Sequence, residues 1–193
     1  EGRVAIVTGA AQGIGAAFAK ALASEGSRLV IADLDTGASV VEEIQSAGGV
    51  AVDVPTDVST KDGCENMVSK AIESFGRLDI LVNNAAIFTA VERKNFDDIP
   101  VDEWDAVMGV NVRGVWLGCC AAVPEMRKNG YGKIISISTG RVFKGTPFFL
   151  HYDASKAAVI GITRSLAREV GDDNICVNAI APGSTMSENV VAR

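Results

Sequence analysis

Residues 4–15 of this chain read VAIVTGAAQGIG, and this stretch decides the fold. Its first four residues are apolar and predict a buried strand, and the pattern that follows predicts a helix over residues 14–25. Between them lie Gly9, Gly13 and Gly15, which supply unusual backbone angles and leave room for a phosphate to approach the main chain. The unpaired N–H groups and positive dipole end at the start of the helix favour a pyrophosphate there. This order of strand, glycine-rich turn and helix predicts a dinucleotide-binding unit rather than an ordinary turn.

The rest of the chain repeats the alternation of short apolar runs and longer helical segments. Strands are predicted at residues 29–32, 50–54, 80–82, 133–137 and 176–180, and helices at 38–47, 61–75, 102–128 and 152–170. Continuous apolar strands indicate burial on both faces, and their alternation with helices indicates a parallel sheet with right-handed crossovers. The prediction is a three-layer, doubly wound α/β fold of the Rossmann type, forming a single domain over residues 1–193, with ligands at the carboxyl ends of the strands.

Composition narrows the possible partners and the compartment. The net charge is −6 and no cluster of Lys and Arg occurs, which argues against nucleic acid. No apolar run reaches the ~18 residues of a membrane span, and we expect a cytoplasmic protein with no signal peptide and no membrane partner. The single histidine, His151, excludes a His-rich metal site, and no metal is predicted. The four cysteines lack C-x-x-C spacing and are expected to be free thiols.

Asp33 ends the second predicted strand, eighteen residues after Gly15. At this distance an acidic side chain can grip the ribose 2′-hydroxyl of NAD. The same carboxylate would repel the 2′-phosphate of NADP, and the glycine loop contains no arginine or lysine to attract it. The sequence therefore predicts NAD as the cofactor in preference to NADP.

Tyr152 and Lys156 are four residues apart and lie on one face of a predicted helix. An ammonium in that position can stabilise a phenolate and lower the pKa of the tyrosine from its usual ~10 toward working pH. Such a pair is common on solvated helix faces and is weak on its own, so its weight depends on the motifs around it.

These motifs together resemble the classical short-chain dehydrogenase/reductase (SDR) family, from the first strand to the end of the chain. Residues 8–15 fit the family's T-G-x-x-x-G-x-G, residues 83–86 fit N-N-A-G with alanine at the last position, residues 152–156 fit Y-x-x-x-K, and residues 182–183 fit P-G. The resemblance implies NAD contacts from Gly9, Gln12, Gly13, Ile14, Gly15, Asp33, Asp57, Val58, Asn83, Ala85, Tyr152, Lys156, Pro182, Gly183, Thr185 and Ser187.

The resemblance also implies a mechanism, in which a secondary alcohol and a ketone are interconverted by hydride transfer. Tyr152 would be the general acid/base, Lys156 would lower its pKa and bind the nicotinamide ribose, and Asn111 would hold a water linked to the lysine. The position of the family's catalytic serine is occupied by Thr139, which keeps a hydroxyl but adds a methyl group. Ser138 is the alternative if the loop bulges by one residue.

Two other functions share these features. A non-catalytic dinucleotide sensor or scaffold is compatible with the fold, and Thr139 leaves room for it. A nucleotide-sugar epimerase or dehydratase can share the Tyr/Lys chemistry, but such proteins usually show a T-G-x-x-G-x-x-G loop and a larger substrate domain. The substrate is expected to be a small alcohol or ketone. Several aromatic residues could line an apolar pocket for it, or belong to the core: Phe88, Phe143, Phe148, Phe149 and His151.

The resemblance suggests an assembly and a longer fold. The family is commonly tetrameric through the long helix and the tyrosine helix, so a homotetramer or homodimer is expected. Small residues at 154, 157, 158 and 161 would permit close helix approach, or pack against the chain's own sheet. The family usually continues past P-G through a lid helix and a last strand, and we expect neither within the 193 residues.

Overall fold

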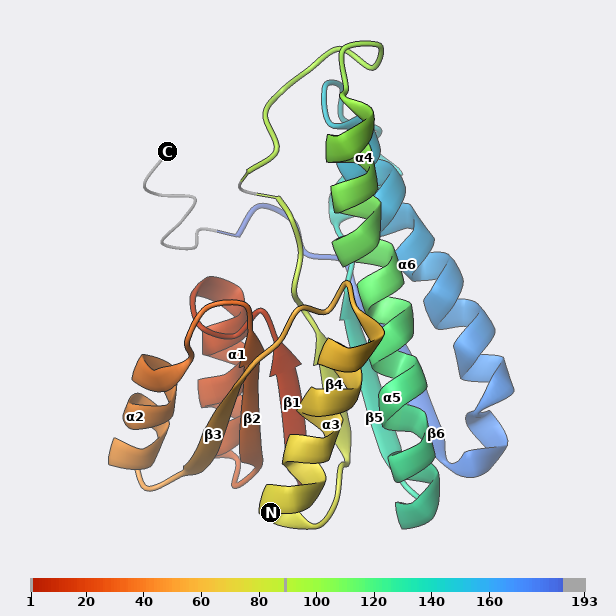
Figure 1. Ribbon diagram of the computed structural model, residues 1–193. Helices are drawn as coiled ribbons and strands as arrows, with labels where there is room; N and C mark the ends of the chain where they lie inside the picture. Colours follow the sequence, from red (N-terminus) through yellow and green to blue (C-terminus); the bar gives the residue numbers. More distant parts are fainter. Residues whose placement is uncertain (1, 89, 186–193) are drawn as a thin grey trace.

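The structure is a computed structural model that describes residues 2–88 and 90–185 (Figure 1). Its described residues form one six-stranded sheet with the strand order β3-β2-β1-β4-β5-β6. The strands are β1 (Val4–Thr8), β2 (Arg28–Asp33), β3 (Val50–Pro55), β4 (Ile80–Asn83), β5 (Gly132–Ile137) and β6 (Ile175–Ile180). Every pair of neighbours is parallel, which confirms the doubly wound α/β prediction.

Helices cover both faces of the sheet, giving three layers (Figure 1). They are α1 (Gly13–Ser24), α2 (Ala38–Ser46), α3 (Lys61–Phe75), α4 (Val101–Met108), α5 (Gly114–Asn129) and α6 (Leu150–Glu169). The core is accordingly divided in two. One cluster packs α1 and α2 against the sheet through residues such as Ala19 and Ile44, and the other packs α3, α5 and α6 through residues such as Met67, Met126 and Val159. Burial on both faces explains why the strands are uniformly apolar.

The long helix predicted at 102–128 is interrupted. Between α4 and α5 lies a π-helical segment, η1 (Gly109–Arg113), so the helical stretch runs over 101–129 with one wide turn inside it. Gly114 follows this turn and lies against α3's preceding loop, where an added Cβ would come within 2.9 Å of Val58 Cγ2. Single π-turns occur frequently at functional sites, and this one carries Asn111.

The same helical stretch bears on the membrane prediction. Among the residues that the structure describes, it alone has the length and mean hydropathy (1.5) that would suffice to cross a membrane. Half of that window is buried inside the fold. A core helix passes the same test, so length and hydropathy do not argue for a membrane span here.

The carboxyl ends of the strands all point to the upper edge of the sheet in Figure 1. The strand order reverses at β1, whose neighbours are β2 on one side and β4 on the other. In open α/β sheets ligands bind in the crevice at this switch point. The loops that follow β1, β2, β4 and β5 therefore meet where a ligand is expected.

Candidate active site

The glycine loop after β1 is built by close packing. An added Cβ at Gly15 would lie 2.1 Å from the carbonyl oxygen of Gly9, and one at Gly9 would lie 2.7 Å from Ala85 Cα. Asn84 holds the loop from the other side, because its Nδ2 donates to the carbonyls of Thr8 (2.9 Å) and Gly9 (3.0 Å). Gly9 and Gly15 are thus required by packing.

Gly13 has a different reason to be glycine. Its φ is +56°, in the left-handed region that favours glycine, and an added Cβ would meet nothing within 4 Å. The backbone at the start of α1 is therefore open to the pocket. The first N–H groups of a helix have no intrahelical acceptor, so this end of α1 can receive an anion.

Asp33 is held over the glycine loop by backbone donors. Its Oδ2 accepts from the Ala11 N–H (2.8 Å) and its Oδ1 from the Asp35 N–H (3.2 Å). A carboxylate has about four lone-pair sites, so two hydrogen bonds leave acceptors for ribose hydroxyls. The geometry fits the predicted role at the adenosine end of a dinucleotide.

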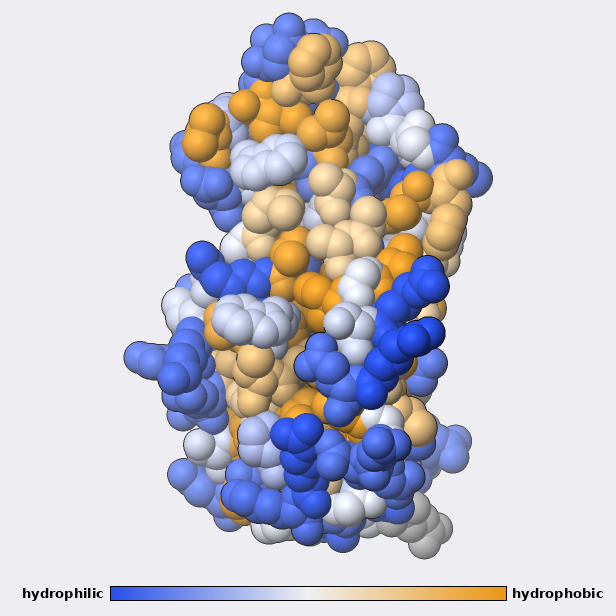
Figure 2. Space-filling model, turned by 90° about the vertical axis from the view of Figure 1, so that its right-hand side faces the viewer, coloured by the Kyte–Doolittle hydropathy of each residue, from blue (hydrophilic) through white to orange (hydrophobic). Residues whose placement is uncertain are grey.

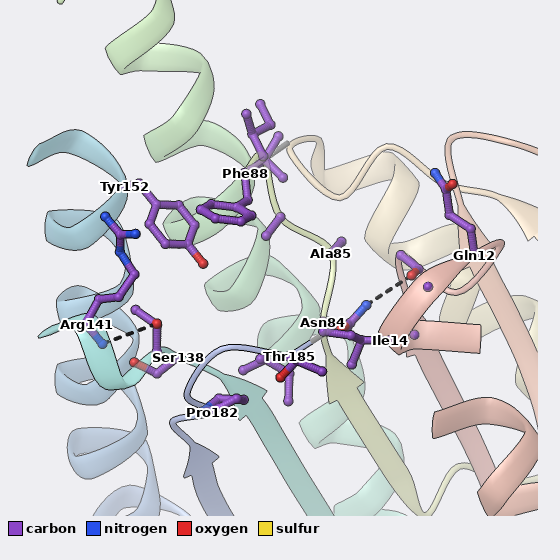
Figure 3. A pocket seen from close by; sticks show the side chains of 18 of the residues that line it. Gln12, Ile14, Asn84, Ala85, Phe88, Ser138, Arg141, Tyr152, Pro182 and Thr185 are labelled. Carbon is purple, nitrogen blue, oxygen red and sulfur yellow. Dashed lines mark hydrogen bonds between the residues drawn. The ribbon is translucent and has the colours of Figure 1, made fainter. Parts of the chain in front are cut away.

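One pocket of about 760 Å³ joins this region to the candidate catalytic residues (Figure 3). It is lined by most of the predicted site residues: Gly9, Gln12, Gly13, Ile14, Gly15, Asp33, Asp57, Val58, Ala85, Ser138, Thr139, Tyr152, Pro182, Gly183 and Thr185. Asn83, Asn111 and Lys156 lie behind this lining, and Ser187 lies outside the described residues. The pocket thus gathers residues from the loops after β1, β2, β3, β4, β5 and β6.

Tyr152 lies in the first turns of α6 and is 8% exposed, with its hydroxyl directed into the pocket (Figure 3). Its ring packs against Phe88, with centroids 4.7 Å apart. Burial raises the pKa of Tyr152 to about 12, the Arg141 guanidinium opposes this rise, and the Asp153 carboxylate adds to it. The hydroxyl is therefore protonated at neutral pH.

Lys156 is buried one turn further along α6, and its Nζ donates to the carbonyl of Ile137 at 2.7 Å. The ammonium lies 5.9 Å from the centre of the Tyr152 ring. Desolvation lowers the pKa of Lys156 to about 8. The prediction that the pKa of Tyr152 is lowered is wrong for this structure, because burial of the phenol outweighs nearby positive charge.

The two candidate hydroxyls after β5 have different partners. Ser138 Oγ donates to the carbonyl of Lys156 (2.8 Å), which uses its only proton inside the fold. Thr139 Oγ1 instead accepts from the Arg141 N–H (3.3 Å) as the cap of the 3₁₀ turn η2 (Gly140–Phe143), the dashed line at the left of Figure 3. Its proton has no acceptor among the residues that the structure describes, so Thr139 is the hydroxyl able to donate to a substrate oxygen.

Asn111 clamps three segments together. Its Oδ1 accepts from the Ile87 N–H (2.8 Å), and its Nδ2 donates to the Ile87 carbonyl (3.2 Å) and to Ser155 Oγ (3.0 Å). The side chain thereby ties η1 to the loop after β4 and to α6, three residues beyond Tyr152. Both polar atoms of the Asn111 amide are hydrogen-bonded within the protein. The water relay that the family resemblance implies for Asn111 stays a prediction.

The two asparagines of the N-N-A-A element, Asn83 and Asn84, have different hydrogen-bond partners. Asn83 is buried below the pocket, where its Nδ2 donates to Ser136 Oγ of β5 (3.3 Å). Asn84 lines the pocket and holds the glycine loop. Sequence reasoning missed Asn84, although its place in the same motif was the available signal.

The aromatic residues expected to line a substrate pocket separate into groups. Phe88 lines the pocket beside Tyr152, and Phe149 packs against Phe88 with centroids 6.3 Å apart. Phe143 (75% exposed) and Phe148 (44%) face solvent. His151 is fully buried and bonded to Glu103 (3.0 Å) between α6 and α4, so of the two roles that the sequence left open for it, pocket lining and core, the structure shows the core role.

Comparison with known proteins agrees with this geometry. The family model described as "short chain dehydrogenase" matches residues 3–193, so the chain belongs to the short-chain dehydrogenase family of oxidoreductases. An uncharacterized oxidoreductase of Thermotoga maritima is 43% identical over 100% of this chain and 76% of its own length.

Two relatives with named activities are similarly close. A 3-oxoacyl-[acyl-carrier-protein] reductase of Synechocystis is 40% identical, over 98% of this chain and 78% of its own length. A trans-4-hydroxycyclohexanecarboxylate dehydrogenase of Sinomonas cyclohexanicum is also 40% identical, over 94% of this chain and 72% of its own length.

Proposed function

We propose that this protein is an NAD-dependent oxidoreductase that interconverts a secondary alcohol and a ketone, with Tyr152 as general acid/base. The observation that carries the proposal is that one continuous pocket joins the glycine loop and Asp33 to Tyr152 and Thr139. The two relatives with named activities support it, since one name describes an oxoacyl reductase and the other a hydroxy acid dehydrogenase.

The residues of the pocket suit a dinucleotide. The start of α1 would receive the pyrophosphate, Asp33 the adenosine ribose, and Asp57 and Val58 the adenine. Lys156 would bind the nicotinamide ribose, and Pro182, Gly183 and Thr185 of the loop after β6 would flank the carboxamide. Ser187, which lies outside the described residues, would contact the carboxamide by the family resemblance. When bound, the dinucleotide supplies the hydride acceptor or donor. The negative charge of Asp33 favours NAD over NADP.

The chain's own residues handle the substrate oxygen and its proton. Thr139 donates a hydrogen bond that orients the oxygen and stabilises charge developing on it. Tyr152 is protonated at neutral pH in this structure, and that form donates a proton to a ketone oxygen. In the opposite direction it must first lose this proton, which the positive charge of Arg141 favours.

The change Tyr152→Phe tests this scheme. We expect a loss of turnover of at least about 10³-fold, because the proposed general acid/base at the substrate oxygen is removed. NADH affinity should stay within about threefold of wild type, because the phenyl ring keeps its packing against Phe88. Turnover is followed by NADH absorbance across secondary alcohols, polyols, hydroxyacyl thioesters and their ketones, with NADP⁺ in parallel.

Two results would contradict the proposal. A Tyr152→Phe variant with near-normal turnover would remove the tyrosine from the chemistry. NAD⁺ binding by the wild type with no turnover on any of these compounds would favour the sensor or scaffold function, with Thr139 as the first position to restore to serine.

We further propose a cytoplasmic homotetramer or homodimer, without nucleic-acid or membrane partners. The face over α4, α5 and α6 supports the assembly, because apolar side chains form a band along it in Figure 2. Val101, Trp116 and Leu150 on these helices are each about half exposed or more. Apolar patches rimmed by charge commonly mark protein interfaces.

A further inference from the structure

The two ends of the pocket differ in charge. Asp33 and Asp57 are the acidic residues that line it, and both lie at the predicted adenosine end. The lining beside Tyr152 instead contains Arg141 and Lys144, both from the segment that follows β5. This positive end stands against a net charge of −6 for the whole chain. A substrate with an anionic group would be drawn to it.

The Arg141 guanidinium is held next to the proposed acid/base. Its central carbon lies 4.3 Å from the Phe149 ring centre and 5.9 Å from that of Tyr152. Its Nε donates to Asp153 Oδ1 at 3.0 Å, which fixes the side chain from behind. Figure 3 shows the guanidinium beside the Tyr152 ring, above the dashed hydrogen bond from the Arg141 N–H to Thr139 Oγ1.

One nitrogen of this guanidinium is buried without a partner. Nη2 of Arg141 has no hydrogen-bond acceptor, although solvent does not reach it. Buried N–H groups are rarely left unpaired, because they lose their bonds to water without replacement. Asp153 takes only one of the five donors of the arginine. Nη2 itself is closed to solvent, so an incoming acceptor would meet the part of the guanidinium that stays accessible: the Arg141 side chain is 25% exposed and lines the pocket.

A carboxylate is the acceptor that this arrangement fits best. Guanidinium and carboxylate match in shape and charge, and the pair is stronger than a neutral hydrogen bond. Aromatic contacts on Phe149 and Tyr152 restrict the arginine beforehand, so little of its freedom is lost on binding. A neutral alcohol or ketone would match the remaining guanidinium donors less well than a carboxylate does.

We propose that the substrate is an oxo acid or hydroxy acid whose carboxylate binds Arg141 while its carbonyl or carbinol oxygen lies at Tyr152 and Thr139. This inference rests on the proposed function and names its substrate class. Arg141 is then the specificity-determining residue, Lys144 adds attraction from the pocket rim, and Phe88 packs against the carbon chain that joins the two groups.

The test measures binding separately from turnover. Three oxo acids of different spacing, acetoacetate, 4-oxopentanoate and 4-oxocyclohexanecarboxylate, are each compared with their uncharged methyl esters. They are titrated calorimetrically into the full chain saturated with NAD⁺, where no hydride is available for a ketone. The variants are Arg141→Met, Arg141→Lys, and Arg168→Met, which removes an exposed arginine at the far end of α6.

We expect at least one acid to bind wild type about tenfold to a hundredfold more tightly than its ester, as a charged hydrogen-bonded pair provides. Arg141→Met should bring that ratio to about one, Arg141→Lys should retain part of it, and Arg168→Met should retain all of it. Equal binding of every acid and ester by wild type would overturn the inference, whether or not Arg141→Met folds. A preference that survives in a folded Arg141→Met would also overturn it.

Turnover with NADH separates this inference from the proposed function. Reduction of the esters without any acid preference would support the proposed oxidoreductase activity and contradict the carboxylate site at Arg141. An acid preference that depends on Arg141, with no reduction of any compound, would support the carboxylate site and contradict the proposed oxidoreductase activity.

Discussion

At the scale of single residues, burial governs the candidate site. Lys156 and Tyr152 are both enclosed, and desolvation moves both toward their uncharged forms, with pKa values of about 8 and about 12. Arg141 donates to Asp153 and stacks on Phe149. Two titratable groups with shifted pKa values thus lie in one pocket beside an arginine, which is typical of sites that move protons.

The variant Lys156→Met tests whether folding lowers the pKa of Lys156, through the pH dependence of the free energy of unfolding. The lysine pKa falls from 10.5 to about 8 on folding, so between these values the unfolded chain binds more protons and wild-type stability rises with pH. The cost of the buried charge, about 3 kcal/mol, is fully present below pH 8 and gone above pH 10.5. Stability of the wild type relative to Lys156→Met should rise by up to that amount over this range.

Urea unfolding of both proteins from pH 7 to 10.5 measures this difference, and the variant-to-variant comparison cancels the titration of the other groups. Lys61→Met serves as the control, because Lys61 is a solvated lysine. A difference between wild type and Lys156→Met that is constant across the pH range would show that folding does not shift this group.

Asp33→Asn tests the nucleotide preference. The amide oxygen can still accept from the Ala11 N–H, so the loop keeps its shape while the charge is removed. We expect affinity for NADPH relative to NADH to rise about tenfold or more, because repulsion of the 2′-phosphate disappears. Fluorescence titration with both nucleotides gives the ratio, and the exposed neighbour Asp35→Asn is the control. An unchanged ratio in Asp33→Asn would end the charge argument.

At the scale of elements, the candidate site is positioned by contacts at the junctions between strands and helices. The β1–α1 junction brings Gly15 against the Gly9 carbonyl, and the π-turn η1 carries Asn111 to Ile87 and Ser155. In both places a polar or glycine residue joins segments that are far apart in the sequence. The loops that would contact a ligand are therefore positioned by these tertiary contacts rather than by their own conformational preferences.

Gly15→Ala should destabilise the junction although alanine favours helices by about 1 kcal/mol over glycine. The added Cβ would lie 2.1 Å from the Gly9 carbonyl oxygen and 2.6 Å from Asn84 Nδ2, and backbone cannot yield as a flexible side chain can. We expect a net loss of about 1–3 kcal/mol and weaker NADH binding. Urea unfolding measures the stability, and NADH titration measures the binding.

Gly171→Ala is the control, because an added Cβ at Gly171 meets nothing within 4 Å. If Gly15→Ala is as stable as wild type and binds NADH equally well, the packing argument is wrong.

At the scale of the whole molecule, the sheet is covered by helices on both faces, while the α4–α5–α6 side keeps apolar groups at its surface (Figure 2). Gly161 lies on the exposed side of α6, with open space where a Cβ would be. This position lets another helix approach closely. The proposed assembly would use this side.

Gly161→Leu should therefore separate assembly from folding. Leucine raises helix propensity and meets no neighbour within the chain, so the fold should be at least as stable. Its bulk would block a close helix contact, and we expect a smaller species than wild type in sedimentation velocity. Arg168→Met is the matched surface control on the same helix. If Gly161→Leu sediments as wild type does, the contact does not involve this face of α6.

The sequence by itself determined the sheet, its parallel direction, the glycine loop and the family, because these follow from local patterns that repeat along the chain. Apolar runs, glycine spacing and strand-helix alternation each act within a few residues. The tertiary structure alone decided that Lys156 bonds to Ile137, that Ser138 rather than Thr139 is used inside the fold, and that Arg141 lies beside Tyr152. It also decided that His151 is buried against Glu103 instead of lining the pocket. Such contacts join segments distant in sequence, and burial, which sets their charges, exists only once those segments are packed.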